Sequence, residues 1–287
     1  MLTIALLGPT LFFVLYMCII PESPRWLLSV GRQAEAARVL QKFARSKKGR
    51  EVATLMENAV GGDNPDRVSV EPVRVWTLFS HWTLCTRILI CAYNRFALSF
   101  VYYGISLNVG RLGGDLYVNY TLGCAVETVA YVLVLLCLFH WGRRKLYAGS
   151  MALGSLGFSL ASLSMLISSS DDSMASVGLV MAGKLGVSAG YAVYFVHVSE
   201  MFPTSVRSTA VGLTSIAGTT GAAVSPYIYQ LCDSMAGRMG VALPMLVYGA
   251  AALGAMVLTL WLPETRGRKM PDSVQEAVTM ELTSRVA

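Results

Sequence analysis

The chain has 287 residues, of which 54% are hydrophobic and only 14% are charged. A soluble domain carries about 25% charged residues, so the composition excludes an ordinary soluble protein and indicates a surface that faces lipid. The formal net charge is +6. Because basic residues mark the cytoplasmic side of a membrane protein, this charge does not predict binding to nucleic acid.

Seven apolar runs of about 20 residues follow one another along the chain, and each is long enough to cross a bilayer core of about 30 Å as a helix. They cover residues 1–20, 83–107, 117–141, 146–168, 175–198, 206–229 and 243–262. The runs are apolar on all sides, unlike the alternating strands of a membrane barrel, and therefore predict an all-α membrane protein. A signal peptide is the alternative for the first run, which has no basic start and no small-residue cleavage site.

One long polar segment, residues 21–81, separates the first run from the other six. Its first half predicts a basic amphipathic helix with a partial apolar stripe. The stripe consists of Ala34, Ala37, Val39, Leu40 and Phe43. Such a helix beside a membrane is expected to lie on anionic lipid or against the ends of a helix bundle, with a regulatory partner as the alternative.

Most basic residues fall in alternate segments between the runs. Of the 23 Lys and Arg residues, 18 lie in the segment 21–81, in the turns after the third and fifth runs, and in the C-terminal tail. The opposite loops contain only Arg111 and Arg238. Because basic residues are retained in the cytosol, we expect a multi-pass membrane protein whose segment 21–81 and C-terminus are cytosolic.

Five stretches of sequence, in this order along the chain, resemble signatures of solute carrier family 22. This is the family of organic cation, anion and carnitine transporters within the major facilitator superfamily. The stretches are residues 21–32 (PESPRWLLSVGR), 102–115 (YYGISLNVGRLGGD), 142–144 (GRR), 200–207 (EMFPTSVR) and 263–272 (PETRGRKMPD). The resemblance covers essentially the whole chain and implies a carrier of twelve helices in the plasma membrane.

The resemblance also implies a division of the chain into four parts. Residues 1–20 match helix six of the family, residues 21–81 the central cytoplasmic loop, residues 82–262 the C-terminal half with helices seven to twelve, and residues 263–287 the cytoplasmic tail. Because Met1 falls inside an apolar run, we expect that the natural ancestor had more helices. A longer isoform or a second chain would supply the missing N-terminal half.

Charged residues at the cytoplasmic ends of the runs form a candidate gate. They are Glu22, Arg143, Arg144, Glu200, Arg207 and Glu264. Pairs between these carboxylates and guanidinium groups would stabilise one conformer of a carrier that alternates between two states. The alternative is that they are solvated loop charges at membrane ends.

Ionisable groups inside the membrane runs are costly unless they are paired or hydrated, and three of them stand out: Arg95, Glu127 and Lys184. Together with nearby hydroxyl and aromatic groups, they form a candidate site for substrate. The candidates are Arg95, Ser99, Tyr102, Glu127, Tyr131, Lys184, Tyr191 and Thr219. Two alternatives remain: Arg95 and Glu127 form an ion pair that only locks two helices, and the tyrosines only pack between helices.

Two positions depart from the family and bear on the charge of the substrate. Arg95-Phe96 stands where many relatives carry Trp-Phe, and Thr219 stands where cation carriers have Asp and anion or carnitine carriers have Arg. Thr219 is neutral and gives no charge preference. If Arg95 and Glu127 neutralise each other, the site suits zwitterions. If they lie apart, Arg95 can bind a carboxylate while Glu127 faces an ammonium group.

Two functions fit these features. The first is transport of small organic ions, with zwitterions or anions favoured, by alternating access as part of a twelve-helix carrier or as a derivative of one. The second is a truncated or pseudo-transporter that binds membrane partners and moves nothing. We expect no enzyme, cofactor or metal site, because the sequence has no nucleotide loop, metal cluster or nucleophile paired with a base.

Overall fold

The computed structural model describes residues 21–24, 27, 32–43, 81–112, 114–167, 173–203, 206–233 and 239–267. The first apolar run, most of the polar segment and the tail beyond residue 267 lie outside the described residues, so their predicted roles stay predictions. The chain divides into two units, Met1–Arg74 and Val75–Ala287.

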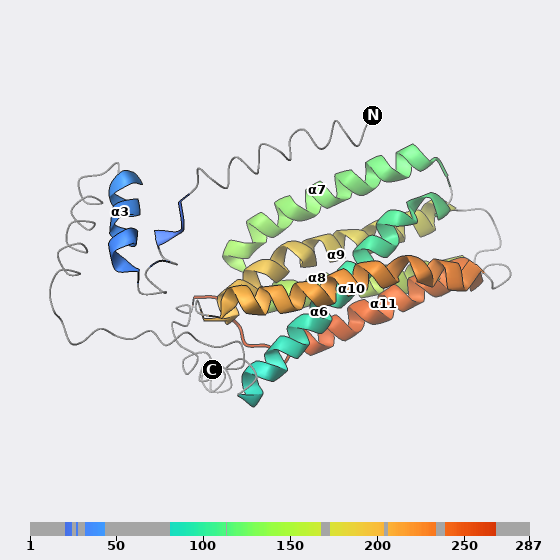
Figure 1. The fold of residues 1–287 in the computed structure, drawn as a ribbon. Helices are drawn as coiled ribbons and strands as arrows, with labels where there is room; N and C mark the ends of the chain where they lie inside the picture. Colours follow the sequence, from blue (N-terminus) through green and yellow to red (C-terminus); the bar gives the residue numbers. More distant parts are fainter. Residues whose placement is uncertain are drawn as a thin grey trace. The chain divides into compact units, whose positions relative to one another are not determined.

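In the first unit, the basic amphipathic helix predicted from the sequence is α3, Gln33–Phe43 (Figure 1). Its buried face differs from the predicted stripe. Ala37 is buried as expected, but Ala36 is buried as well, whereas Ala34 is exposed. Val39 and Leu40 of the predicted stripe are half-buried, so the buried face keeps three predicted positions and includes Ala36 rather than Ala34.

The second unit is a bundle of long helices that run alongside one another (Figure 1). Its α-helices are α6 (Trp82–Leu107), α7 (Leu116–His140), α8 (Arg143–Ile167), α9 (Ser173–Met201), α10 (Arg207–Asp233) and α11 (Met239–Thr259), with a short 3₁₀ turn, η1 (Val109–Arg111), after α6. They match the last six predicted runs to within a few residues. The described part of the chain contains helices and no strands, which confirms the all-α prediction.

Five of these helices are long and apolar enough to cross a membrane, judged by length and composition, and α10 is the exception among the described α-helices of the second unit. Small and hydroxyl residues make α10 less apolar. Ser215, Thr219 and Thr220 donate their hydroxyls to the carbonyl oxygens four residues earlier, at distances of 2.8, 3.1 and 3.0 Å. These bonds within the helix satisfy groups that would otherwise be costly to place in lipid.

The most extensive contact between described helices of the bundle involves α8 and α9, and glycines bring their backbones close together. A Cβ atom added to Gly157 would lie 2.6 Å from the backbone nitrogen of Gly183, and one added to Gly186 would lie 2.5 Å from that of Gly154. Small residues at such a seam let two membrane helices approach backbone to backbone. The other main pairs are α6 with α10, α8 with α11, and α7 with α9.

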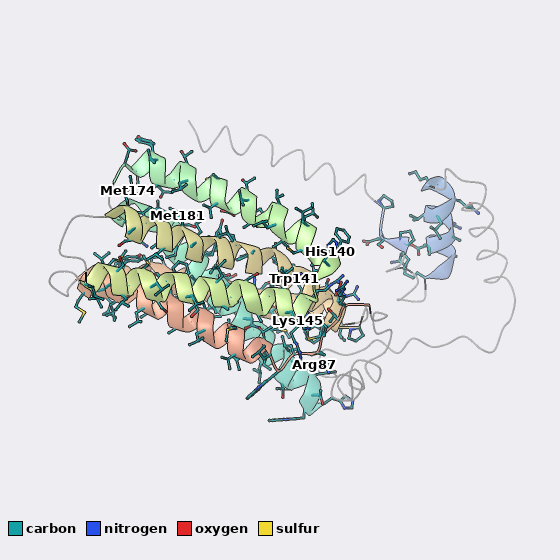
Figure 2. All side chains as sticks on the ribbon, turned by 180° about the vertical axis from the view of Figure 1, so that it is seen from behind. Arg87, His140, Trp141, Lys145, Met174 and Met181 are labelled. Carbon is teal, nitrogen blue, oxygen red and sulfur yellow. The ribbon has the colours of Figure 1, made fainter. Side chains whose placement is uncertain are left out.

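One end of the bundle carries the basic residues that the sequence places together. Figure 2 shows Arg87, His140 and Lys145 at this end, whereas Met174 lies at the opposite end. Helices α6, α8 and α10 begin here, and α7, α9 and α11 end here. We refer to this end as the basic end of the bundle.

Candidate functional site

Arg95 of α6 is held by aromatic rings from α9. Its guanidinium carbon lies 4.5 Å from the ring centroid of Tyr191, 4.6 Å from that of Phe195 and 5.8 Å from that of Tyr194. These three rings share one side of α9 because they are spaced three and four residues apart. Two guanidinium nitrogens, Nε and Nη1, are buried and have no hydrogen-bond partner in the described part of the chain. The charge is stabilised by cation–π contacts.

Glu127 of α7 accepts two hydrogen bonds at the same oxygen. The hydroxyl of Tyr102, from α6, donates to Oε1 at 2.8 Å, and the hydroxyl of Tyr131, one turn further along α7, donates to it at 2.7 Å. Bonds to a charged acceptor are stronger than neutral ones. The carboxylate therefore connects α6 to α7 and orients two phenol rings around itself.

A pair of tyrosine rings connects the two charges. The ring of Tyr102 lies 5.4 Å from the ring of Tyr191, measured between centroids, and the Tyr191 hydroxyl lies 3.5 Å from Oγ of Ser99. The direct ion pair between Arg95 and Glu127, which the sequence left open, is not formed between these two described residues. We call Arg95, Ser99, Tyr102, Glu127, Tyr131 and Tyr191 the central cluster.

Lys184 lies apart from the contacts of the central cluster. Its side chain is buried in α9 and faces α7, because a Cβ atom added to Gly123 would lie 2.8 Å from its Nζ. Lys184 lies seven residues before Tyr191, which is about two turns of α9.

Thr219 of α10 is exposed, and its hydroxyl donates to the carbonyl of Ser215. Its neighbour Gly218 contacts Arg95 instead: a Cβ atom there would lie 2.8 Å from Cγ and 2.9 Å from Nε of Arg95. Gly218 and Phe195 were not among the residues predicted from the sequence. The helical spacing of Phe195, four residues after Tyr191, was the signal that could have identified it.

At the basic end, one carboxylate–guanidinium pair of the predicted gate is present. Nε of Arg143 lies 3.2 Å from Oε1 and 3.1 Å from Oε2 of Glu200, and the hydroxyl of Thr265 donates to Oε2 at 2.7 Å. Arg143 begins α8, Glu200 lies one residue before the end of α9, and Thr265 follows α11. The carboxylate of Glu200 therefore ties three parts of the bundle together.

Two of the other gate candidates, Glu264 and Arg207, contact main-chain groups. Oε1 of Glu264 accepts from the backbone nitrogens of Arg144 at 3.4 Å and Thr265 at 3.1 Å, rather than from a guanidinium group. Nε of Arg207 donates to the carbonyl of Phe202 at 3.3 Å. Glu22 is exposed in the first unit. Main-chain carbonyls and amides at helix ends compete with side chains for these charges.

The bundle has the fold of half a transporter of the major facilitator superfamily. An inward-open structure of the xylose transporter XylE from E. coli matches 91% of this chain and 53% of its own, with a TM-score of 0.55 and 17% identity. The proton:xylose symporter XylE bound to 6-bromo-6-deoxy-D-glucose matches 96% of this chain and 57% of its own, with a TM-score of 0.64 and 18% identity. At this level of identity the likeness shows the fold alone.

The chain belongs to the sugar (and other) transporter family, whose model matches residues 1–275. It is 34% identical to the organic cation transporter protein of Drosophila melanogaster over 281 residues, which are 96% of this chain and 50% of that protein. It is 32% identical to the organic cation/carnitine transporter 2 of Homo sapiens, covering 98% of this chain and 49% of that protein. These relatives confirm the resemblance to solute carrier family 22.

The chain spans about half the length of the curated relatives it matches. It is a multi-pass membrane protein of the transporter class, because its family, its relatives and its apolar helices all belong to that class. These relatives are transporters rather than enzymes.

Proposed function

We propose that this chain forms the C-terminal half of a carrier that moves small organic ions across the membrane by alternating access, and that zwitterions or anions are favoured. The observation that carries this proposal is the central cluster. It holds one positive and one negative side chain within the membrane helices, separated by two tyrosine rings.

The positive side of the cluster suits a carboxylate. Nε and Nη1 of Arg95 are buried donors without an acceptor among the described residues, and unsatisfied buried donors are costly. A substrate carboxylate would accept charge-assisted hydrogen bonds from these guanidinium donors. The rings behind Arg95 hold the charge in place without using its hydrogen-bond donors.

The negative side of the cluster suits an ammonium group. The two tyrosine bonds to Glu127 use Oε1, which leaves the electrostatic attraction of the carboxylate available to a cationic head. The faces of Tyr102 and Tyr131 add cation–π attraction. A simple cation gains this contact but is repelled by Arg95, whereas a zwitterion satisfies both charges.

The basic end supplies the gate of this carrier. The proposed gate residues at this end are Arg143, Arg144, Glu200, Arg207 and Glu264. Bonds such as the one between Arg143 and Glu200 stabilise whichever state contains them, and a few such bonds are enough to bias an equilibrium between two conformers.

The second half of the carrier comes from a longer form of this protein or from a second chain. Carriers of this fold place the substrate between two halves near the bilayer midplane. In the proposed arrangement residues 1–20 form a preceding helix, 21–81 a cytosolic loop, 82–262 the membrane half and 263–287 a cytosolic tail. The carrier then resides in the plasma membrane with its C-terminus in the cytosol.

A second candidate function is a non-transporting protein that binds membrane partners. The observation that favours it is the exposure of α7. Only 17% of the residues in its most apolar 18-residue stretch are buried within the bundle. An apolar face of this kind accommodates another helix as readily as lipid.

An uptake experiment separates the two functions. A radiolabelled zwitterion, an organic anion and an organic cation are supplied to cells that express this chain alone or together with an N-terminal half. Zwitterion or anion uptake that requires both halves supports the carrier. Stable expression at the surface with no uptake of any of the three in either case supports the binding protein.

A further inference from the structure

A polar pocket of about 480 Å³ opens at the basic end, away from the contacts of the central cluster. It lies where α6 begins and where the chain continues beyond α11. The residues that matter for its chemistry are Trp82, Thr83, Thr86, Arg87, Arg144 and Trp261. Figure 2 shows Arg87 at the same end of the bundle as Lys145.

Two arginines give the pocket a positive charge. Arg87 lies on α6 and is only 3% exposed, so its charge is held inside the protein at the pocket wall. Nη1 of Arg144 donates to the carbonyls of Leu260 at 3.4 Å and Leu262 at 3.2 Å, which fixes the guanidinium group beside the pocket and does not use Nη2. None of the described lining residues carries a carboxylate. An anion is the complementary ligand.

The first turn of α6 adds further donors to this pocket. The helix begins at Trp82, and its N-cap residue His81 makes no side-chain hydrogen bond to the helix end. Backbone N–H groups at the start of a 26-residue helix attract phosphate through their donors and through the helix dipole. The hydroxyl of Thr83 lies in the same turn and lines the pocket.

Two tryptophans indicate the depth of the pocket in the membrane. Trp82 is 84% exposed and Trp261 is 73% exposed, although both are large and largely apolar. Exposed tryptophans of membrane helices concentrate at the level of the lipid headgroups. Leu260, beside Trp261, is also exposed. The rim of the pocket therefore contacts lipid headgroups on the side of the membrane surface and acyl chains on the side of the bilayer core.

We propose that this pocket binds the phosphate of an anionic membrane lipid in the leaflet that faces the basic end. Basic pockets between membrane helices take such headgroups. The phosphate is held by Arg87, Arg144 and the first turn of α6, while the acyl chains lie along the exposed apolar surface next to the tryptophans. The proposal does not depend on what the central cluster transports.

Native mass spectrometry of the chain purified in detergent tests the proposal directly. The probes are phosphatidylinositol 4,5-bisphosphate, phosphatidylserine and phosphatidylcholine, and the dissociation constant of each is measured. We expect both anionic lipids to bind more tightly than phosphatidylcholine. Arg144→Gln should weaken anionic lipid binding by roughly tenfold or more, because it removes a charged donor. Arg87→Lys keeps the charge and should retain most of the binding.

The matched control is Lys145→Gln, which removes an exposed charge from the next residue of α8 and should change binding by less than about threefold. Equal binding of phosphatidylcholine, or an equal loss in the Lys145 and Arg144 variants, would overturn the proposal. A second experiment measures the thermal stability of the protein with two water-soluble ligands, inorganic phosphate and inositol trisphosphate. Protection by these ions equal to that given by the lipids would show a dissolved phosphate as the ligand and would also overturn it.

Discussion

The guanidinium carbon of Arg95 lies 4.5 Å from the centroid of the Tyr191 ring. This contact holds a positive charge inside the bundle by a ring face and leaves its hydrogen-bond donors for another acceptor. The ring face, rather than the hydroxyl, is the part of Tyr191 that this role requires.

Substitutions of Tyr191 separate these two parts. Tyr191→Phe keeps the face and loses only the 3.5 Å contact of the hydroxyl with Ser99, so we expect transport close to wild type. Tyr191→Leu removes the ring face and should weaken the binding of carboxylate-bearing substrates by about 0.5–2 kcal/mol. Competition uptake at matched surface expression measures the difference. If the Phe variant lost as much as the Leu variant, the hydroxyl would be the functional group.

Glu127→Gln should weaken the binding of substrates with a cationic head and should affect the binding of purely anionic competitors less. The substitution keeps the shape of the side chain and an acceptor for Tyr102, but removes the charge that attracts an ammonium group. The expected loss for cationic heads is about 1.5–3 kcal/mol. Tyr131→Phe is the matched control, because it removes one bond to Glu127 and leaves the carboxylate in place. An equal loss for every substrate that tracks protein abundance would make Glu127 structural.

Gly218→Ala should displace Arg95, because the new Cβ atom would lie 2.8 Å from Cγ of that side chain. Gly212 of α10 offers a matched control, since a Cβ atom there meets nothing within 4 Å. We expect a reduced affinity for carboxylate-bearing substrates in the first variant and unchanged affinity in the second, both measured by competition uptake. If neither variant changed the preference for carboxylate-bearing substrates, the position of Arg95 would not determine that preference.

Glu200→Gln should shift the balance between inward-facing and outward-facing states without changing which substrates compete. The substitution removes the charge from the pair with Arg143 and from the bond with Thr265. The expected shift is about 1 to 3 kcal/mol. Arg207→Ala tests a second gate residue in the same way. Labelling of cysteines from each side of the membrane measures the balance between the two states. An unchanged balance in both variants would show that these residues are solvated charges without a gating role.

The helices of the bundle were predictable because each apolar run is long and bounded by polar turns. The helix α10 was identified in this way even though its hydroxyl residues make it less apolar than its neighbours. Its C-terminal end was placed too early, at Tyr229 instead of Asp233, since the polar residues Gln230 and Asp233 interrupt the apolar run while the helix continues. Hydropathy alone does not fix a helix end to within a turn.

The members of the central cluster were predictable, but their partners were not. An ionisable residue inside a membrane run stands out by its cost, and Arg95 and Glu127 were found for this reason. Their partners depend on which helices pack together. Arg95 lies against rings of α9, and Glu127 instead meets the hydroxyl of Tyr102, which lies seven residues further along α6. A shift of one residue, from Thr219 to Gly218, turns a side chain by about 100° around α10, and only packing determines which of them meets Arg95.

The most direct measurement compares two competitors that share a cationic head but differ by a carboxylate. Betaine and tetramethylammonium compete against a radiolabelled zwitterion in cells that express this chain with an N-terminal half, as wild type and as Arg95→Leu. We predict that betaine competes much better than tetramethylammonium in the wild type, and that this preference disappears in the variant at equal surface expression. Equal competition by the two compounds in the wild type, or a preference that survives in Arg95→Leu, would contradict the assignment of the central cluster as a zwitterion site.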